Sequence, residues 1–189
     1  MGKYDDLTRE ETKALLNKIG GTEVTRKVLR GKKKIIVQDI ARQQPPLVGT
    51  IVKTLTLKPF RAKSVADAIR QGRYNYVHFG IVRLFTSNEV NITTEVKVDL
   101  VGFDRDWSNE DVSVWAKANG GKKPILPKHI YAIGIQHPEE QRHARIVGHG
   151  SVRADNIMCL RGDSGWRILD RYPVSYDWGR DCLVGFLHE

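Results

Sequence analysis

The stretch "NITTEVKVDLVGF", residues 91–103, gives the clearest strand signal in this chain of 189 residues. Successive side chains of a β-strand point to opposite faces of the sheet, so an alternation of apolar and polar residues predicts a strand with one face toward water. Here the apolar residues are Ile92, Val96, Val98 and Leu100, and the polar ones are Thr93, Glu95, Lys97 and Asp99. A β-sheet is therefore expected to frame the fold.

A second β-rich run, "YNYVHFGIVRLF" at residues 74–85, precedes this strand, and turn-forming residues 87–89 separate the two. This spacing predicts that the two runs pair as a hairpin. Further strands are expected at residues 47–57, 146–147, 157–160, 166–169 and 182–187, and helices are expected to begin at Ser64, Ser108 and Pro127. Strands about ten residues apart are typical of an antiparallel sheet with short turns.

The first part of the chain carries helix signals instead. A capping box at residues 8–11 begins one helix, paired glycines at residues 20–21 end it, and a second short helix follows. The Gln-Gln-Pro-Pro run at residues 43–46 is the expected linker. We therefore predict an α+β protein, with a small basic helical unit at residues 1–44 and a mixed, mainly antiparallel β domain with two or three helices at residues 45–189.

The formal net charge of +9 is concentrated in the N-terminal third of the chain. Residues 1–73 contain 17 Lys or Arg and 7 Asp or Glu, whereas the remainder is close to neutral. Such asymmetry indicates a polyanionic partner, most often nucleic acid, although a solvated basic face that only aids solubility gives the same count. The candidate phosphate contacts are Arg26, Lys27, Arg30, Lys32, Lys33 and Lys34. No aromatic residue lies among them for base stacking, so sequence-specific binding is not indicated.

The turn sequence Gly162-Asp163-Ser164-Gly165 matches the way in which chymotrypsin-like proteases present their nucleophile. With His78 as the base and Asp104 as the acid that orients it, Ser164 would complete a catalytic triad. The match is partial, because Trp166 replaces the second of the expected paired glycines and His78 lies inside an apolar run. Since Gly-Asp-Ser-Gly is also ordinary turn chemistry, a β-turn is the preferred interpretation.

Four aromatic residues gather near the C-terminus among Asp and Arg side chains: Trp166, Tyr172, Tyr176 and Trp178. Large rings beside charged groups are typical of recognition surfaces, because they bury much area and lose little rotamer entropy. The pattern predicts a ligand-binding face. The alternative is that at least two of the four rings close the core of the sheet.

Other chemistries find less support in the sequence. Four histidines fall within 21 residues, but their spacing matches no zinc motif, so neither a metal nor another cofactor is expected: His129, His137, His143 and His149. Cys159 and Cys182 are expected to be buried thiols rather than a disulfide. No apolar run approaches the length that spans a bilayer, and we find no signal peptide, so we expect a cytoplasmic protein without membrane contact.

Two stretches carry a resemblance to known proteins. The first is "LTREETKALLNKIGGTEVTRKVLRGK", Leu7 to Lys32, and the second runs from Lys123 to Glu189 and contains "KPILPKHIYAIGIQHPEEQ", "GDSGWRIL" and "DWGRDCLVGFL". Both resemble uncharacterised small proteins of candidate-phylum bacteria, and the second is also similar in layout to the C-type-lectin-like modules of formylglycine-generating enzymes. The resemblance implies a helix entry before irregular strands. It implies no chemistry, because the catalytic cysteine pair of those enzymes is missing.

Three hypotheses about function follow. The favoured one is a non-catalytic binding protein whose basic N-terminal third contacts a polyanion such as nucleic acid and whose aromatic C-terminal face holds a second ligand. The second is a chymotrypsin-like serine protease that uses His78, Asp104 and Ser164. The third is a protein derived from a mobile element that inhibits a partner protein by surface contact.

Overall fold

Seven strands form one mixed sheet in the computed structural model, which describes residues 45–85 and 90–188. The strands are β1 (Gly49–Leu57), β2 (Tyr76–Val77), β3 (Val96–Phe103), β4 (Arg145–Val147), β5 (Asn156–Asp163), β6 (Trp166–Pro173) and β7 (Cys182–Leu187). Their order in the sheet is β1-β3-β7-β4-β5-β6-β2. Only the pairs β4–β7 and β2–β6 are parallel in this part of the chain. The predicted α+β class is therefore confirmed, whereas the basic helical unit predicted at residues 1–44 lies outside the described residues.

Five α-helices and one short 3-10 helix accompany the sheet within the described ranges. They are α3 (Val65–Gly72), α4 (Ile81–Leu84), α5 (Asn109–Ala118), α6 (Pro127–Gln136), α7 (Glu140–His143) and η2 (His149–Ser151). The prediction of two or three helices was thus too low, because α4 and α7 are single turns of four residues and too short to show an apolar period. None of the helices in the described part of the chain is long and apolar enough to cross a membrane.

The three longer helices begin where their capping signals predict. Ser64 Oγ accepts a hydrogen bond from the backbone N–H of Asp67 at 3.1 Å and so caps α3. Ser108 and Asp111 form a reciprocal capping box at the start of α5, and Pro127 occupies the first position of α6. These side chains satisfy or remove the backbone donors that the first turn of a helix leaves unpaired.

The hairpin predicted between residues 74–85 and 91–103 does not form. Of the first run, only the two residues of β2 are a strand, and β2 pairs in parallel with β6 at one edge of the sheet. β3 lies between β1 and β7, near the other edge. After Gly80 the chain turns into α4, which buries Ile81 completely. The apolar residues of this run are therefore buried in part by a helical turn rather than by strand pairing.

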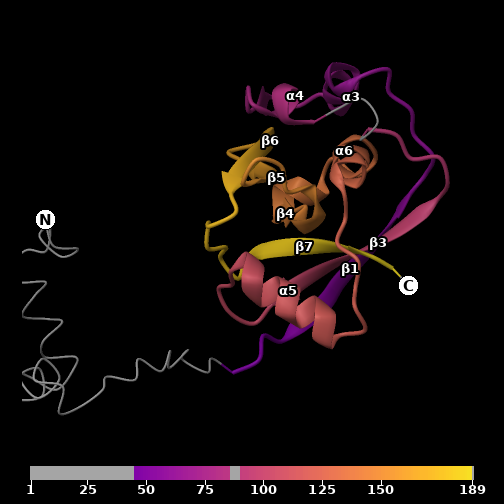
Figure 1. The fold of residues 1–189 in the computed structure, drawn as a ribbon. Helices are drawn as coiled ribbons and strands as arrows, with labels where there is room; N and C mark the ends of the chain where they lie inside the picture. The colour runs from indigo at the N-terminus through magenta and orange to yellow at the C-terminus, as the bar shows by residue number, and fades with distance from the viewer. Residues whose placement is uncertain (1–44, 86–89, 189) are drawn as a thin grey trace, which may run out of the picture. The chain divides into compact units, whose positions relative to one another are not determined.

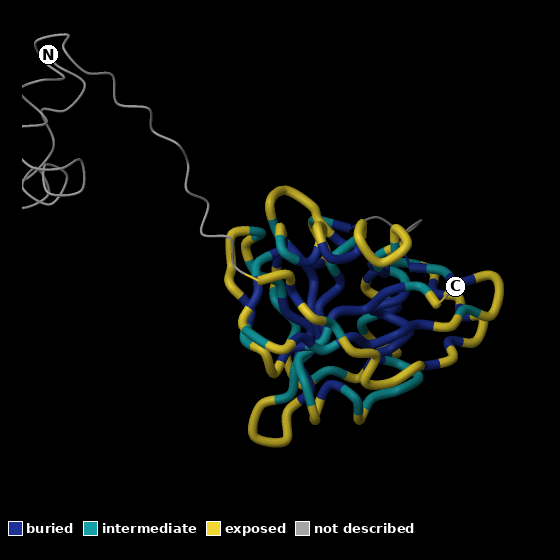
Figure 2. Tube along the Cα trace, turned by 90° about the horizontal axis from the view of Figure 1, so that it is seen from below, coloured by how far each residue is buried: buried dark blue, intermediate teal, exposed yellow. Residues whose placement is uncertain are grey.

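An apolar core covers each face of the sheet. One core, with α3, α4 and α6, includes Val65, Ala68, Ile81, Val98, Leu100, Ile130, Ile133 and Ile146. The other, under α5, includes Val101, Trp107, Val112, Trp115, Val147, Trp178 and Phe186. We call them the helical core and the tryptophan core. Figure 1 shows α3, α4 and α6 on one side of β7 and α5 on the other, and Figure 2 shows the buried stretches gathered inside the domain. Burying each large apolar side chain stabilises the fold by about 1.5–3 kcal/mol.

β3 is buried on both faces, which corrects the prediction of a strand with one wet face. Asp99 is only 1% exposed. Its carboxylate accepts a hydrogen bond from Thr54 Oγ1 at 2.6 Å and lies 2.9 Å from His188 Nδ1 and 3.9 Å from Lys122 Nζ. Burial alone would raise the pKa of Asp99, but the hydrogen bonds from Thr54 and His188 and the charges of His188 and Lys122 lower it below its ordinary value. Asp99, a polar residue of the alternating pattern, is thus buried with hydrogen-bond partners for its carboxylate.

The Gly-Asp-Ser-Gly stretch forms the turn between β5 and β6, as its turn chemistry predicts. Asp163 pairs with Trp166, which leaves Ser164 and Gly165 as a two-residue loop. Both loop residues have positive φ, 47° and 87°, the geometry that matches the twist of a two-stranded hairpin. The hydroxyl of Ser164 donates to Asp163 Oδ1 at 3.1 Å, so its bond lies within the turn itself.

The two cysteines are free thiols and both are buried, as predicted. Burial raises the pKa of Cys159 well above its ordinary value and that of Cys182 to about 11. At neutral pH both side chains are therefore protonated and act as small apolar groups in the core.

Candidate functional site

The first described segment, residues 45–85, is strongly basic. It contains seven Lys or Arg and a single Asp, a formal charge of +6 within a chain of +9. All seven basic residues are exposed: Lys53, Lys58, Arg61, Lys63, Arg70, Arg73 and Arg83. We call this set the basic surface. Clustered charge of one sign raises the local potential and attracts ions of the opposite sign.

Three of the seven cations lie on the exposed sides or at the ends of α3 and α4. α3 buries Ala68 in the helical core and leaves Arg70 outside, and Arg73 follows at the left-handed C-cap of the helix. α4 repeats this arrangement, since Ile81 is buried and Arg83 is exposed. α3 and α4 both pack on the helical core, on the same side of the sheet as α6 (Figure 1). Arg70, Arg73 and Arg83 therefore belong to this helical layer, whereas Lys53 lies on β1 and Lys58, Arg61 and Lys63 lie on the connection between β1 and α3.

Most of the basic surface has no acidic partner within the described part of the chain. Lys53 Nζ lies 2.6 Å from Glu140 Oε1, and Arg70 pairs with Asp67. The other five cations form no ion pair with any described residue. These five cations can therefore bind phosphate groups without first breaking an ion pair with a described residue.

Three exposed aromatic rings lie at the β2 edge of the sheet. Tyr76 is 46% exposed, Phe79 71% and Trp166 57%. Tyr76 lies opposite Ile168 in the β2–β6 pair, and Trp166 is two residues before Ile168 on β6. Because side chains alternate along a strand, Tyr76, Trp166 and Ile168 share one face of the sheet, and diagonal neighbours of this kind are within reach of aromatic side chains. We call Tyr76, Phe79 and Trp166 the aromatic edge.

The loop that carries Phe79 is held by His78. The two rings stack with centroids 4.6 Å apart, and the backbone N–H of His78 donates to the Leu169 carbonyl at 3.0 Å. His78 Nδ1 faces two donors, the Gly80 N–H at 3.1 Å and Arg171 Nε at 3.2 Å. A ring nitrogen that accepts cannot carry a proton, so the proton of the neutral imidazole is on Nε2. These bonds tie the loop to β6.

The three residues of the serine-protease alternative are not brought together. Asp104 follows β3, and its Oδ1 accepts from the Val48 N–H at 3.1 Å. β3 and β6 are four strand spacings apart in the sheet, about 19 Å. Ser164 lies at the turn before β6. The backbone of His78 is hydrogen-bonded to Leu169 of β6, and the five residues from Ser164 to Leu169 span about 16 Å of extended strand. These distances do not allow a catalytic triad of His78, Asp104 and Ser164.

The structure also divides the four aromatic residues predicted as a ligand face. Trp178 is fully buried and stacks on Trp107 with centroids 5.6 Å apart. Tyr172 and Tyr176 pack against Trp178, with centroids 5.4 and 4.9 Å away. Trp166 lies at the opposite end of β6, beside the turn. Trp178 and Tyr172 therefore close the tryptophan core, Tyr176 packs on them but is itself 37% exposed, and Trp166 is a separate exposed ring.

Two arginines near these tyrosines are already engaged. The guanidinium of Arg145 lies 4.9 Å from the ring centroid of Tyr172. Arg161 Nε lies 3.1 Å from Asp170 Oδ2, and its Nη1 lies 3.4 Å from Asp163 Oδ2. Because their charges are matched by carboxylates or an aromatic face, they are weaker candidates for phosphate contacts than the basic surface.

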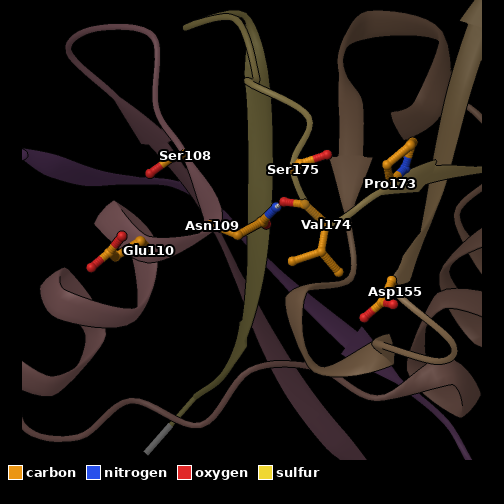
Figure 3. A pocket seen from close by; sticks show the side chains of 7 residues that line it. All are labelled: Ser108, Asn109, Glu110, Asp155, Pro173, Val174 and Ser175. Carbon is orange, nitrogen blue, oxygen red and sulfur yellow. Dashed lines mark hydrogen bonds between the residues drawn. The ribbon is translucent and has the colours of Figure 1, made fainter. Parts of the chain in front are cut away.

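A groove of about 470 Å³ lies between the start of α5 and the connection from β6 to β7 (Figure 3). Its lining residues are Ser108, Asn109, Glu110, Asp155, Pro173, Val174 and Ser175. Asn109 points across it and donates from Nδ2 to the Val174 carbonyl (Figure 3). The charged groups of the lining, Glu110 and Asp155, are both carboxylates and repel phosphate. The groove is therefore not a site for a polyanion.

Asn109 also belongs to a hydrogen-bonded chain that has no obvious sequence signal. Its Oδ1 lies 3.3 Å from His149 Nδ1, and His149 Nε2 lies 3.0 Å from Ser113 Oγ. The amide oxygen can only accept, so Nδ1 carries the ring proton and Nε2 is the acceptor. Burial lowers the pKa of His149 and favours this neutral ring. Ser113 Oγ also donates to the Asn109 carbonyl at 2.9 Å, so its single proton is shared between two acceptors. These hydrogen bonds join α5 to η2.

The remaining histidines of the sequence cluster do not meet: His129 lies in the first turn of α6, His137 is its C-cap, and His143 ends α7. His129 Nδ1 accepts from the Leu126 N–H at 2.9 Å, and burial, aided by the charge of Lys128, lowers the pKa of His129 to about 4. His137 Nε2 lies 2.9 Å from the Thr56 carbonyl. Within residues 45–85 and 90–188, no three His, Cys, Asp or Glu side chains are grouped as a metal ion requires.

The sequence contained part of the signal for this site. Six of the seven cations of the basic surface contribute to the excess of charge in residues 1–73. The six residues that the sequence predicts as phosphate contacts lie outside the described residues: Arg26, Lys27, Arg30, Lys32, Lys33 and Lys34. Tyr76 and Phe79 were hidden by the prediction of a continuous strand. The sequence feature that points to them is that Tyr76 and Phe79 both lie within the basic segment, residues 45–85.

The candidate site is therefore the basic surface together with the aromatic edge, two of whose rings lie close to Arg73 and Arg83 in the sequence. Comparisons of the chain with models of protein families, with curated proteins and with solved structures found no match.

Proposed function

We propose that this domain is a binding module for a polyanion, with nucleic acid as the ligand class, and that the basic surface contacts the phosphate backbone. The observation that carries the proposal is the set of seven exposed cations against one carboxylate in residues 45–85. Phosphate contacts of this kind release condensed counterions, which supplies most of the sequence-independent affinity for nucleic acid.

The arrangement of the cations suits contacts to the backbone rather than to base edges. Lys58, Arg61 and Lys63 lie on the connection between β1 and α3, Arg73 is the C-cap of α3, and Arg83 lies on α4. Long, exposed Lys and Arg side chains can reach successive phosphates of a flexible nucleic-acid strand. Contacts to phosphate position a protein on nucleic acid but carry no sequence information by themselves. We therefore expect binding with little sequence preference.

A salt titration of the full chain tests the proposal. The ligand is a fluorescein-labelled oligonucleotide of about 16 nucleotides, and binding is measured by fluorescence anisotropy. If the five cations without an ion pair each contact one phosphate, the logarithm of the association constant falls against the logarithm of salt concentration with a slope of about −3.5 on a single strand. An affinity that does not change with salt, or no binding at low salt, would overturn the proposal.

Charge reversal at matched positions locates the site. Arg61→Glu with Lys63→Glu reverses two members of the basic surface, and Lys117→Glu with Lys123→Glu makes the same change in net charge on α5 and the loop after it. We expect the first pair to lower affinity about ten-fold or more and to flatten the salt slope by about 1.4, since two contacts are lost. The control pair should bind nearly as the wild type does. Equal losses in both variants would show that only net charge matters.

The residues outside the described part are tested in the same assay. Lys32→Glu with Lys33→Glu measures the contribution of the N-terminal basic run. A loss confined to this variant, with no effect of the changes at Arg61 and Lys63, would place the contacts in residues 1–44 and contradict the assignment to the basic surface.

A further inference from the structure

The aromatic edge consists of rings that the fold leaves in water. Of the four tryptophans, Trp107, Trp115 and Trp178 are buried and Trp166 alone is exposed. Tyr76 and Phe79 join it at the same edge of the sheet. Single exposed apolar residues are ordinary, but several large rings gathered at one edge are typical of a binding surface.

Two cations of the basic surface lie close to Tyr76 and Phe79 in the sequence. Arg73 precedes Tyr76 by three residues, and Arg83 follows Phe79 by four. Both arginines are exposed, and neither forms an ion pair with a described residue. Rings that can stack on bases and guanidinium groups that can bind phosphates are thus combined within one short segment.

The ring of Phe79 and the strand that carries Tyr76 are also held in place before any ligand binds. His78 stacks on Phe79 and accepts hydrogen bonds from Gly80 and Arg171. Tyr76 lies on β2, which is paired with β6. A side chain that is already fixed loses little conformational entropy on binding, so more of the contact energy is available for affinity.

From these observations we infer that the aromatic edge stacks unpaired bases, so that the nucleic acid this domain binds is single-stranded. The inference rests on the proposed function and adds the class of ligand to it. In a duplex, neighbouring base pairs cover the faces of the bases, and rings on a protein surface gain little. In a single strand every base offers a π-face, which makes stacking tolerant of sequence. The positive charge of the segment that carries Tyr76 and Phe79 favours this ligand over an apolar protein segment.

Three ligands with the same number of phosphates separate stacking from charge. They are a single-stranded oligothymidylate, an abasic strand of equal length, and a duplex with as many phosphates in total. The full-length wild type should bind the oligothymidylate about ten-fold or more tightly than the abasic strand, since each stacked base contributes measurably to affinity. Acrylamide quenching of the exposed Trp166 should fall when the oligothymidylate binds and should not change with the abasic strand.

Variants of the aromatic edge complete the test. Tyr76→Ala with Trp166→Ala should remove the preference for bases over the abasic strand while the binding of the abasic strand is retained. Tyr76→Phe with Trp166→Phe keeps the rings and should keep the preference. Val114→Ala, which shortens an exposed apolar side chain on α5, is the control for a general loss of surface area and should leave the preference unchanged.

The outcomes distinguish this inference from the proposed function. Equal affinity for the oligothymidylate and the abasic strand, or for the duplex and the single strand, would overturn the stacking of bases and leave phosphate binding intact. Failure of the wild type to bind any of the three at low salt would overturn the proposed function. Equally tight binding of polyglutamate would show that the surface takes an acidic protein segment, which contradicts both.

Discussion

Arg171 Nε lies 3.2 Å from Nδ1 of His78, although 93 positions separate the two residues in the sequence. The bond joins β6 to the loop after β2, where His78 stacks on Phe79. One exposed ring of the aromatic edge is thus held by a residue of a different strand. The position of Phe79 depends on tertiary structure and not only on its own loop.

Arg171→Ala should lower the affinity for oligothymidylate several-fold, because it frees the loop that carries Phe79. Its effect on the melting temperature should be small, since the bond lies near the surface. Gly80→Ala provides an independent test, because an added Cβ would lie 2.7 Å from Arg171 Nε and push the guanidinium away. Anisotropy titrations and thermal melts of both variants check this. Unchanged affinity in both would show that the bond does not position the ring.

The buried ring of His129 should make the domain less stable in acid. Burial, with the charge of Lys128, lowers its pKa to about 4, whereas the unfolded chain titrates near 6.5. Below about pH 6.5 the unfolded state binds more protons, so the free energy of unfolding falls as pH falls, by up to about 3 kcal/mol near pH 4. His149, whose pKa is also lowered by burial, acts in the same direction.

The variant His129→Gln keeps a polar side chain but does not titrate. Urea denaturation between about pH 7 and pH 5 should show a flatter dependence for the variant than for the wild type, because one of the two contributing imidazoles is removed. Parallel curves for the two proteins would show that His129 does not contribute to the acid sensitivity.

Asp99→Asn should lower the free energy of unfolding at neutral pH by about 1–3 kcal/mol, because it removes a buried charge-assisted contact with His188. The lowered pKa of Asp99 sets the sign: its stabilising effect is present above about pH 4, the unfolded value, and is lost as pH falls further. The difference between variant and wild type should therefore shrink in acid. Asp177→Asn, at an exposed position, is the control and should have little effect at either pH. A loss for Asp99→Asn that is constant with pH would exclude a role of the charge.

The tight turn between Arg153 and Asn156 offers a stabilising change. Ala154 and Asp155 both have positive φ, 45° and 57°, in a region that favours glycine over other residues. Ala154→Gly should raise the free energy of unfolding by roughly 0.5–1 kcal/mol. The same substitution at Ala66 in α3 is the control, and there it should lower stability by about 1 kcal/mol. A loss of stability at both positions would contradict the argument from backbone geometry.

Much of the fold could be predicted from local patterns. The caps at Ser64 and Ser108 and the proline at position 127 act within a single turn, so the starts of α3, α5 and α6 are visible in the sequence. The pairing of β2 with β6 is different, because it joins residues that are 92 positions apart. A short apolar run such as "HFGIVRL" is compatible with a strand or with a buried helical turn. Only the packing of Ile81 into the helical core decides between them.

The site was predictable in charge but not in geometry. Counting Lys and Arg identifies the basic third of the chain, because formal charge does not depend on folding. Distance in the sequence groups the buried Trp178 with the exposed Trp166 and leaves out the exposed Tyr76. The sheet makes the opposite division, since β2 lies beside β6. Which rings are exposed depends on this strand pairing, and no local pattern contains it.

The central claim is that single-stranded nucleic acid lies on the aromatic edge, and photocrosslinking tests it most directly. The full chain is irradiated with an oligonucleotide that contains 5-iodouracil, which crosslinks to aromatic rings in contact with the base, and the adducts are located by mass spectrometry. We expect the adducts at Tyr76, Phe79 or Trp166. Adducts confined to Tyr172, Tyr176 or residues 1–44 would contradict this account.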